Sequence, residues 1–120
     1  MSWNLDSDRP IFVQILERIR MDIISGKYKP GDKLPSVREL AAEAAVNPNT
    51  MQRAFAELER SGLVYSQRTS GRFITENQVL IRQIREEVAQ ESINSFLQNM
   101  KQLGYEETEL LDLIKKKIGS

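Results

Sequence analysis

The sequence predicts a mainly α-helical protein with one small β-hairpin, and three observations point to this class. Apolar residues recur at helical spacing in five separate stretches of the 120 residues. Glycine, proline and capping residues stand where those stretches begin or end. One pair of short segments rich in β-branched and aromatic residues flanks a turn sequence, which is typical of a hairpin.

The first helix is expected to begin near Pro10, because proline is favoured in the first helical turn. Ser25 and Gly26 end it. Its apolar face consists of Phe12, Ile15, Leu16, Ile19 and Ile23. The sequence Lys29-Pro30-Gly31-Asp32 predicts a turn, and Leu34 before Pro35 predicts a short extended step, since a residue before proline avoids helical angles.

Two shorter helices should follow this turn. Ser36 and Glu39 match a capping box, in which each side chain satisfies a free backbone amide at the start of a helix. That second helix ends near Ala45 and has a small apolar face of Leu40, Ala41 and Ala44. Asn47 is a suitable N-cap and Pro48 a suitable first residue for a third helix, which Gly62 ends. Its inward face is Met51, Ala54, Phe55 and Leu58.

A hairpin and two further helices complete the prediction. The strands are expected at 63–66 and 72–75, with residues 68–71 at the tip between them. A long amphipathic helix should run over 78–103, a length of about 39 Å at 1.5 Å per residue. Gly104 ends it, and a last helix follows over about 106–118. We therefore expect an N-terminal domain of residues 1–76 and a C-terminal domain of residues 77–120.

Composition narrows the class of function. Seventeen Lys and Arg balance seventeen Asp and Glu, so net charge indicates no partner. The chain has no His and no Cys, which removes the commonest general base, the commonest metal ligand and the thiol nucleophile. We expect a protein that is not an enzyme and holds no metal or cofactor. No apolar run approaches the roughly 18 residues of a membrane span, and the N-terminus is unlike a signal peptide, so we expect a cytoplasmic location.

Two short helices joined by a tight turn and followed by a basic hairpin form the layout of a winged helix-turn-helix. In this layout the N-terminus of the second helix of the pair enters the major groove of DNA. Asn and Gln there can pair bidentately with adenine. The candidate contacts are Asn47, Asn49, Thr50, Gln52 and Arg53 on the helix, and Arg68 and Arg72 in a stretch of the hairpin that contains no acid.

Each of these residues also has a plainer explanation. Asn47 is fully accounted for as an N-cap. Asn49, Thr50 and Gln52 are ordinary surface residue types. Arg68 and Arg72 can serve only to protect a hairpin edge from aggregation. The alternative function is therefore a winged-helix module that binds another protein and no DNA, since a fold alone does not determine a function.

Three stretches, residues 10–15, 26–41 and 46–63, closely resemble the DNA-binding domain of GntR-family regulators. The second contains Pro30-Gly31-x-x-Leu34-Pro35-Ser36-x-Arg38, and the third contains Asn47-Pro48-Asn49-Thr50. The resemblance covers roughly residues 9–75, and the short C-terminal part is similar to the YtrA subfamily. It implies a bacterial transcription regulator, usually a repressor, that binds palindromic operator DNA as a homodimer.

The resemblance also implies roles for particular residues. Arg38 matches the arginine of the Pro-Ser-x-Arg motif, which touches DNA in the family. Asn47, Asn49, Thr50 and Gln52 match recognition-helix positions. Gly71 matches the glycine at the tip of the wing, where the backbone enters the minor groove. Thr69 stands where many relatives have the first glycine of Gly-x-Gly, so the resemblance does not fix the conformation of this wing or the depth of its insertion into the minor groove.

The apolar face of the long helix needs a partner, because the winged domain already has a core from its first three helices. We expect residues 78–118 to form a two-helix unit that pairs with its copy by two-fold symmetry. The predicted dimer interface comprises Ile84, Val88, Phe96, Leu97, Met100, Leu111 and Ile114. A small-molecule effector, if there is one, should bind between the C-terminal helices and the winged domain, or across the dimer, with Trp3, Phe96 and Tyr105 as candidate lining; the alternative is that none exists.

Overall fold

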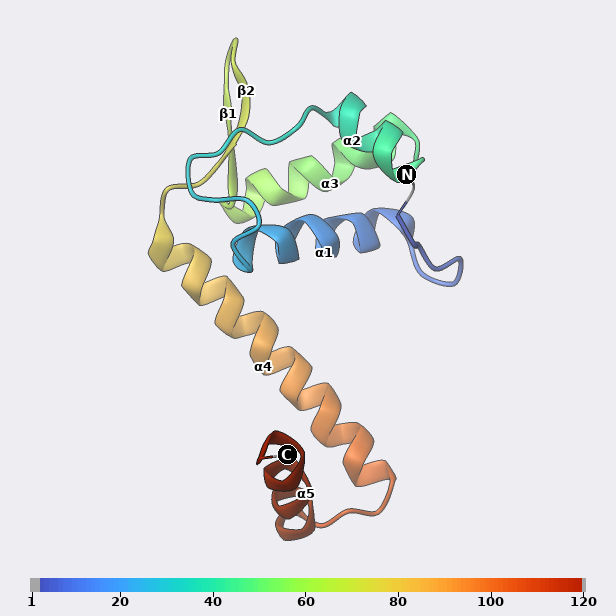
Figure 1. The fold of residues 1–120 in the computed structure, drawn as a ribbon. Coiled ribbons are helices and arrows are strands. Elements are labelled where there is room, and N and C mark those ends of the chain that lie inside the picture. The colour runs from blue at the N-terminus through green and yellow to red at the C-terminus, as the bar shows by residue number, and fades with distance from the viewer. Residues whose placement is uncertain (1–2, 120) are drawn as a thin grey trace. The chain divides into compact units, whose positions relative to one another are not determined.

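The structure, a computed structural model, describes residues 3–119, and these form five helices and one two-stranded sheet (Figure 1). The helices are α1 (Ile11–Ile24), α2 (Val37–Ala44), α3 (Pro48–Ser61), α4 (Gln78–Gln102) and α5 (Glu107–Gly119), and the strands are β1 (Val64–Gln67) and β2 (Gly71–Ile74). The predicted class, mainly helical with a small β wing, is confirmed. The chain divides into two compact units, the first ending at Arg85 and the second beginning at Glu86. The first unit therefore includes the first turns of α4.

The predicted helix starts follow from side chains that satisfy free backbone amides. The backbone N–H of Glu39 donates to Ser36 Oγ and that of Ser36 to Glu39 Oε1, both at 3.1 Å, so the capping box is present. The N–H of Asn49 donates to Asn47 Oδ1 at 2.8 Å. Between α2 and α3, Ala45 adopts φ 59°, a left-handed conformation that reverses the chain within one residue. This turn sets the close spacing of the two helices.

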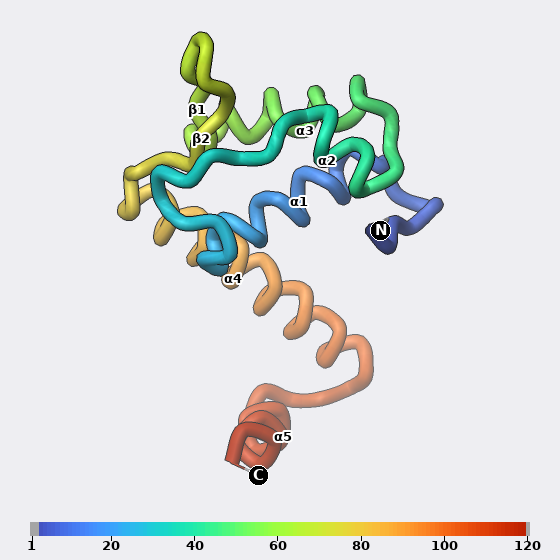
Figure 2. The backbone as a smooth tube through the Cα atoms, turned by 45° about the horizontal axis from the view of Figure 1, so that its top comes forward, coloured from blue at the N-terminus to red at the C-terminus, as the bar shows by residue number. Residues whose placement is uncertain are grey.

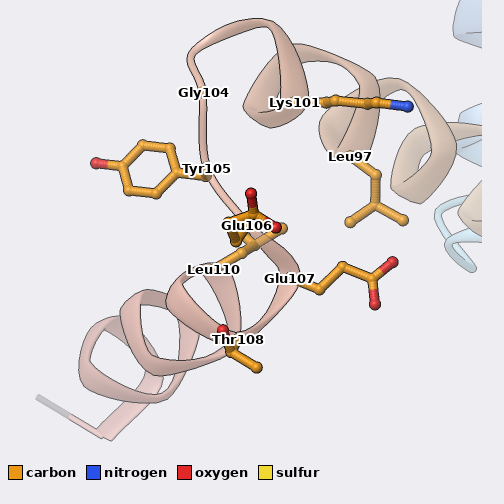
Figure 3. A pocket seen from close by; sticks show the side chains of 8 residues that line it. All are labelled: Leu97, Lys101, Gly104, Tyr105, Glu106, Glu107, Thr108 and Leu110. Carbon is orange, nitrogen blue, oxygen red and sulfur yellow. The ribbon is translucent and has the colours of Figure 1, made fainter.

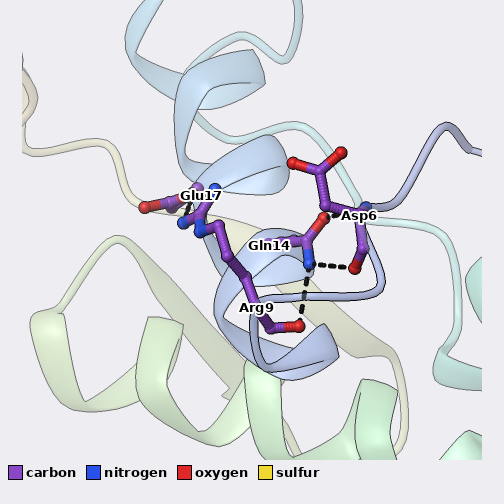
Figure 4. Close-up of polar contacts among 4 residues, drawn as sticks. All are labelled: Asp6, Arg9, Gln14 and Glu17. Atoms are coloured by element: carbon purple, nitrogen blue, oxygen red, sulfur yellow. Dashed lines mark hydrogen bonds and ion pairs between the residues drawn. The ribbon is translucent and has the colours of Figure 1, made fainter.

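The start of α1 agrees with the prediction to within one residue. Pro10 is the N-cap and makes no side-chain cap hydrogen bond, and the helix begins at Ile11. Gln14, a buried amide, instead fixes the preceding segment (Figure 4). Its Nε2 donates to the carbonyls of Asp6 and Arg9 at 2.8 and 3.0 Å, and its Oε1 accepts from the N–H of Asp6 at 2.7 Å. Because a buried amide is costly unless it is hydrogen-bonded, Gln14 favours one path for the chain before α1.

The core of the first unit lies where α1, α2 and α3 pack together. Each helix contributes the apolar face that the sequence predicts, and almost all of these side chains are buried. They are Ile15, Ile19 and Ile23 of α1, Leu40, Ala41 and Ala44 of α2, and Met51, Ala54, Phe55 and Leu58 of α3. The small residues of α2 let it approach α3 closely. This core holds the N-termini of α2 and α3 as rigid supports for exposed side chains.

The hairpin is tighter than predicted. Val64 pairs with Ile74 and Gln67 with Gly71, so the turn consists of residues 68–70 alone. The expectation of strands at 63–66 and 72–75, with Gly71 in the tip, was wrong by one residue on each side. The N–H of Ser70 donates to the carbonyl of Gln67 at 3.1 Å, and Gly71 adopts φ 107°, which allows pairing to begin directly after the turn.

A third segment pairs with β2, and this pairing was not predicted from the sequence. Residues 31–34 run beside β2 (Figure 2), and Lys33 forms a β-bridge with Phe73. The N–H of Leu34 donates to the carbonyl of Arg72 at 2.8 Å, and that of Ile74 to the carbonyl of Asp32 at 2.8 Å. The extended Leu34-Pro35 step is thus a short edge of the wing sheet, and it connects the wing directly to the start of α2.

The second unit consists of the rest of α4 and α5. Gly104, with φ 95°, ends α4, and the N–H of Tyr105 donates to the carbonyl of Met100 at 3.2 Å. Leu110 is buried, whereas most other large apolar side chains in this unit are exposed. They include Ile93, Phe96, Leu97, Leu103, Leu111, Leu113 and Ile118. The unit therefore leaves most of its apolar side chains uncovered.

Candidate nucleic-acid interface

The N-terminus of α3 presents the polar side chains that the sequence predicts. Asn49, Gln52 and Arg53 are exposed and Thr50 is half-buried. Asn47 is exposed and uses its Oδ1 to cap the helix, while its amide NH2 stays available to donate. The guanidinium of Arg53 lies 3.7 Å from the centroid of the Phe12 ring of α1. This stack limits the conformations of Arg53 without burying it.

Arg38 lies in the first turn of α2 and is exposed. Its neighbour Glu39 is occupied by the capping box, and the hydrogen bond from the backbone N–H of Ser36 holds the pKa of that carboxyl below its usual value. Within residues 3–119, Arg38 makes no ion pair. The guanidinium of Arg38 is therefore available to an external anion.

Arg72 does not point away from the protein. Its Nε donates to Glu59 Oε1 of α3 at 2.6 Å, and its guanidinium lies 5.2 Å from the centroid of the Phe55 ring. Ser66 of β1 donates its hydroxyl to the same Glu59 oxygen at 2.8 Å. Both strands of the wing are thus tied to one carboxylate of α3. In this arrangement Arg72 positions the wing, and its contact with DNA stays a prediction.

Lys33 is a basic residue that sequence reasoning did not select. Its Cε lies 3.1 Å, and its Nζ 3.8 Å, from the point where a Cβ on Gly71 would stand, so the missing side chain of Gly71 makes room for the lysine. In the part of the chain described, Lys33 makes no ion pair, and its ammonium lowers the pKa of Glu39. Lys33 thus carries a positive charge beside Gly71, at the end of the wing nearest its turn. The sequence feature that could have pointed to Lys33 was the extended Leu34-Pro35 step beside it.

The wing turn contributes Arg68, which is exposed and, among residues 3–119, has no ion-pair partner. Gly71 is exposed and follows the turn directly. The arrangement thus offers two kinds of group: neutral hydrogen-bonding side chains at the start of α3, and unpaired cations on the wing and α2. Neutral amides suit base edges, and cations suit phosphates.

The predicted interface residues are distributed over both units. Ile84 belongs to the first unit and is half-buried; in the second unit Val88, Met100 and Ile114 are also half-buried. Phe96, Leu97 and Leu111 are 39%, 43% and 55% exposed. Each of these apolar side chains is thus at least partly exposed in the single chain, and the dimer stays a prediction.

The three residues predicted to line an effector site occupy different surroundings. Trp3 donates its indole N–H to Glu43 Oε1 at 3.4 Å and lies under the guanidinium of Arg18. Tyr105 lines a cavity of about 580 Å³ in the second unit, together with Leu97 and Leu110 (Figure 3). Phe96 is exposed on α4. The shared site stays a prediction.

Residues 3–119 contain no group of acidic side chains placed to hold a metal ion. In the same range, no helix is long and apolar enough to span a lipid bilayer.

The ion pair between Glu59 and Arg72 gives a prediction about stability and pH. Hydrogen bonds from Arg72 and then Ser66 lower the pKa of Glu59, so its contribution is present above the unfolded-state pKa, about 4.3, and is lost as pH falls through the lower folded value. Glu59→Gln should reduce the free energy of unfolding at pH 7 by less than about 1 kcal/mol, because both partners are partly solvent-screened.

Urea unfolding at pH 7 and pH 3 measures this effect. The difference from wild type should shrink at the lower pH. Glu57→Gln is the matched control, since Glu57 lies on the same helix and pairs with the largely exposed Arg60 at 3.3 Å. An equal loss at both pH values in Glu59→Gln would show that the carboxylate charge is not what stabilises the wing.

The sequence matches the model for bacterial regulatory proteins of the gntR family over residues 12–74. The chain is 39% identical over 115 residues to YhcF of Bacillus subtilis, an HTH-type transcriptional regulator, with 96% of this chain and 95% of that protein covered. It is 48% identical over 71 residues to YtrA of the same organism, an HTH-type transcriptional repressor, with 59% and 55% covered. The resemblance inferred from the sequence is confirmed.

Two solved structures extend the comparison. A GntR family transcriptional regulator from Listeria monocytogenes superposes with a TM-score of 0.87 at 39% identity, covering 93% of this chain and 98% of that one. The DNA-binding domain of AraR, solved in complex with its operator ORE1, superposes with a TM-score of 0.54 at 31% identity, covering 62% of this chain and 94% of that one. The first similarity extends over nearly the whole chain.

Proposed function

Because the chain belongs to the GntR family of bacterial regulatory proteins, we propose that it is a transcription regulator, a repressor that binds a palindromic operator as a homodimer. The observation that carries this proposal is the polar N-terminus of α3, together with the unpaired cations Arg38 on α2 and Arg68 in the wing turn. AraR, whose related domain was solved on operator DNA, supports it. Such a protein acts on DNA in the cytoplasm and needs no catalytic group.

The proposed contacts divide by chemistry. Gln52, Asn49 and Thr50 read base edges in the major groove, and Asn47 donates its free amide to a phosphate. Arg38, Arg53 and Arg68 bind phosphates, and the backbone at Gly71 approaches the minor groove. Arg72 supports the wing through Glu59, and Lys33 adds a phosphate contact beside Gly71, near the wing turn.

The proposed dimer uses the uncovered apolar side chains of α4 and α5. They are Ile84, Val88, Phe96, Leu97, Met100, Leu111 and Ile114, all exposed or half-buried in the single chain. Two-fold pairing makes one surface self-complementary. It also presents two copies of α3 to half-sites about 34–36 Å apart, one turn of DNA.

Selection of duplexes from a randomised pool, followed by fluorescence-anisotropy titration, tests the function. We expect enrichment of a palindrome and binding that weakens steeply with salt, because phosphate contacts release counterions. The competing function is a winged-helix module that binds protein. It is favoured if no duplex is enriched and no salt-sensitive binding appears at micromolar protein and low salt.

Arg38→Ala should weaken binding to the operator and to random DNA by similar factors, about ten-fold, and make the salt dependence shallower by about one unit of slope. The reason is that an exposed, unpaired guanidinium in the first turn of α2 contacts the backbone and reads no base. Lys116→Ala removes the same charge from α5 and is the matched control. Unchanged affinity of Arg38→Ala for both duplexes would remove Arg38 from the interface.

Replacing Lys33 and replacing Arg72 should have different effects on operator affinity and on thermal stability. Lys33→Gln should weaken operator binding several-fold with little change in melting temperature, since an exposed substitution usually costs less than about 0.5 kcal/mol. Arg72→Gln should lower the melting temperature, because it leaves Glu59 without its main partner. Anisotropy and thermal unfolding of both variants provide the comparison. Wild-type affinity in Lys33→Gln would exclude the lysine from the interface.

A further inference from the structure

A cavity of about 430 Å³ lies where the end of α1, the turn after it and the first turns of α4 meet, within the first unit. Its apolar lining includes Ile23, Ile24 and Ile81, all of which are largely buried. Ligand sites commonly enclose about 300–1,000 Å³ and combine apolar walls with a few polar groups. The cavity is therefore large enough for a small organic molecule.

Among residues 3–119, the cations that line the same cavity are Lys29 from the turn and Arg82 and Arg85 from α4, and no acidic residue lines it. Arg82 and Arg85 are three residues apart and so lie on one face of the helix. Within residues 3–119 none of the three makes an ion pair, although acids and bases are equal in number in the chain. The lining of the cavity is therefore positively charged and attracts anions.

Two other features suit an anion. The cavity lies at the N-terminal end of α4, where Gln78 lines it and where the helix dipole favours negative charge. Tyr28 also lines it, and burial followed by the charge of Asp22 raises the pKa of its hydroxyl, which stays a neutral hydrogen-bond donor. The lining thus combines two guanidinium groups, an ammonium and a phenol with aliphatic side chains.

We propose that this cavity is a regulatory site for a phosphorylated small organic molecule. Arg82, Arg85 and Lys29 bind the phosphate, because a guanidinium group can donate two parallel hydrogen bonds to two phosphate oxygens. The organic part packs against Ile23, Ile24 and Ile81. The regulatory consequence rests on the proposed DNA-binding function. A ligand that contacts both the end of α1 and the start of α4 would stabilise one position of α4 relative to α1. It would alter operator affinity only if it binds the DNA-bound and the free protein with different affinities.

Phenyl phosphate is a suitable probe, since it combines a phosphate with an apolar ring. Titration of the full-length protein, followed by two-dimensional amide NMR, should shift the resonances of residues 25–29 and 78–85. Inorganic phosphate should bind more weakly at the same place, and benzyl alcohol should not bind. Arg82→Gln with Arg85→Gln should weaken phenyl phosphate binding by about ten-fold or more. Lys115→Gln with Lys116→Gln is the charge-matched control and should bind as wild type does.

Shifts confined to the start of α3 and the wing would overturn the proposal, because the probe would then occupy the proposed DNA interface. Unchanged affinity in the double arginine variant, or no shifts at about 10 mM probe, a concentration that detects even millimolar binding, would also overturn it. Operator affinity with and without saturating probe tests the regulatory step, and no change would refute that step. The NMR titration contains no DNA, so failure of the protein to bind any operator leaves the test of the cavity intact.

Discussion

Replacing Phe96 and Leu97 together by Asp should convert the protein from a dimer into monomers and weaken operator binding by about a hundred-fold or more. Both side chains are large, apolar and about 40% exposed on α4 of the single chain. Two carboxylates at the centre of an apolar interface lose their hydration without gaining partners, which costs several kcal/mol per ion. A monomer also loses the gain in affinity that comes from binding two half-sites at once.

Sedimentation velocity at tens of micromolar protein measures the assembly, and anisotropy measures binding to the operator. Ser95→Asp with Gln98→Asp is the matched control: it adds two negative charges to exposed positions of α4, neither of which is three or four residues from Phe96 or Leu97. The control should stay dimeric. A wild-type protein that sediments as a monomer under these conditions would refute the two-fold arrangement itself.

Gln52→Ala should reduce the preference for operator over random DNA by about 1–3 kcal/mol, a factor of roughly 5–150, if Gln52 pairs bidentately with a base. Gln52 is exposed in the N-terminal half of α3, the part of the recognition helix that reaches base edges in this fold. Affinity for random DNA should change little, because phosphate contacts supply most non-specific binding.

Parallel anisotropy titrations with the operator and with a scrambled duplex give the ratio directly. Gln83→Ala, an exposed glutamine of α4, is the control for the residue type and should leave the ratio unchanged. An equal loss of affinity for both duplexes in Gln52→Ala would assign the residue to a phosphate contact, and specificity would then depend on other positions.

Local rules predicted the helices of the first unit well. The capping box at Ser36 and Glu39, the N-cap at Asn47 and the end of α3 at Gly62 each depend on a few neighbouring residues, and all are present. The inward faces of the first three helices were also correct, because helical spacing fixes which side chains share a face. These elements place the start of α3, the part of the candidate site that sequence reasoning identified.

Pairings between distant segments could not be predicted. Residues 31–34 join β2 across almost forty positions of sequence, and no local pattern reveals that hydrogen bonding. The same pairing brings Lys33 beside Gly71. Arg72 was selected because its stretch of sequence lacks acids, but its partner Glu59 lies two elements earlier, on α3. Charge counted along the chain therefore overestimated the free positive charge of the wing.

The division of the chain within α4 couples the two units through the cooperativity of helix formation. No glycine or proline occurs between Gln78 and Gln102, and α4 is helical over this range. Helix formation is cooperative, because each residue added to a helix forms a further backbone hydrogen bond. Ile81, near the start of α4, is buried in the first unit. Fraying of α4 in its exposed second half can therefore propagate toward Ile81. Burial of that half in a dimer would suppress fraying, so the local stability of the DNA-binding unit should rise with protein concentration.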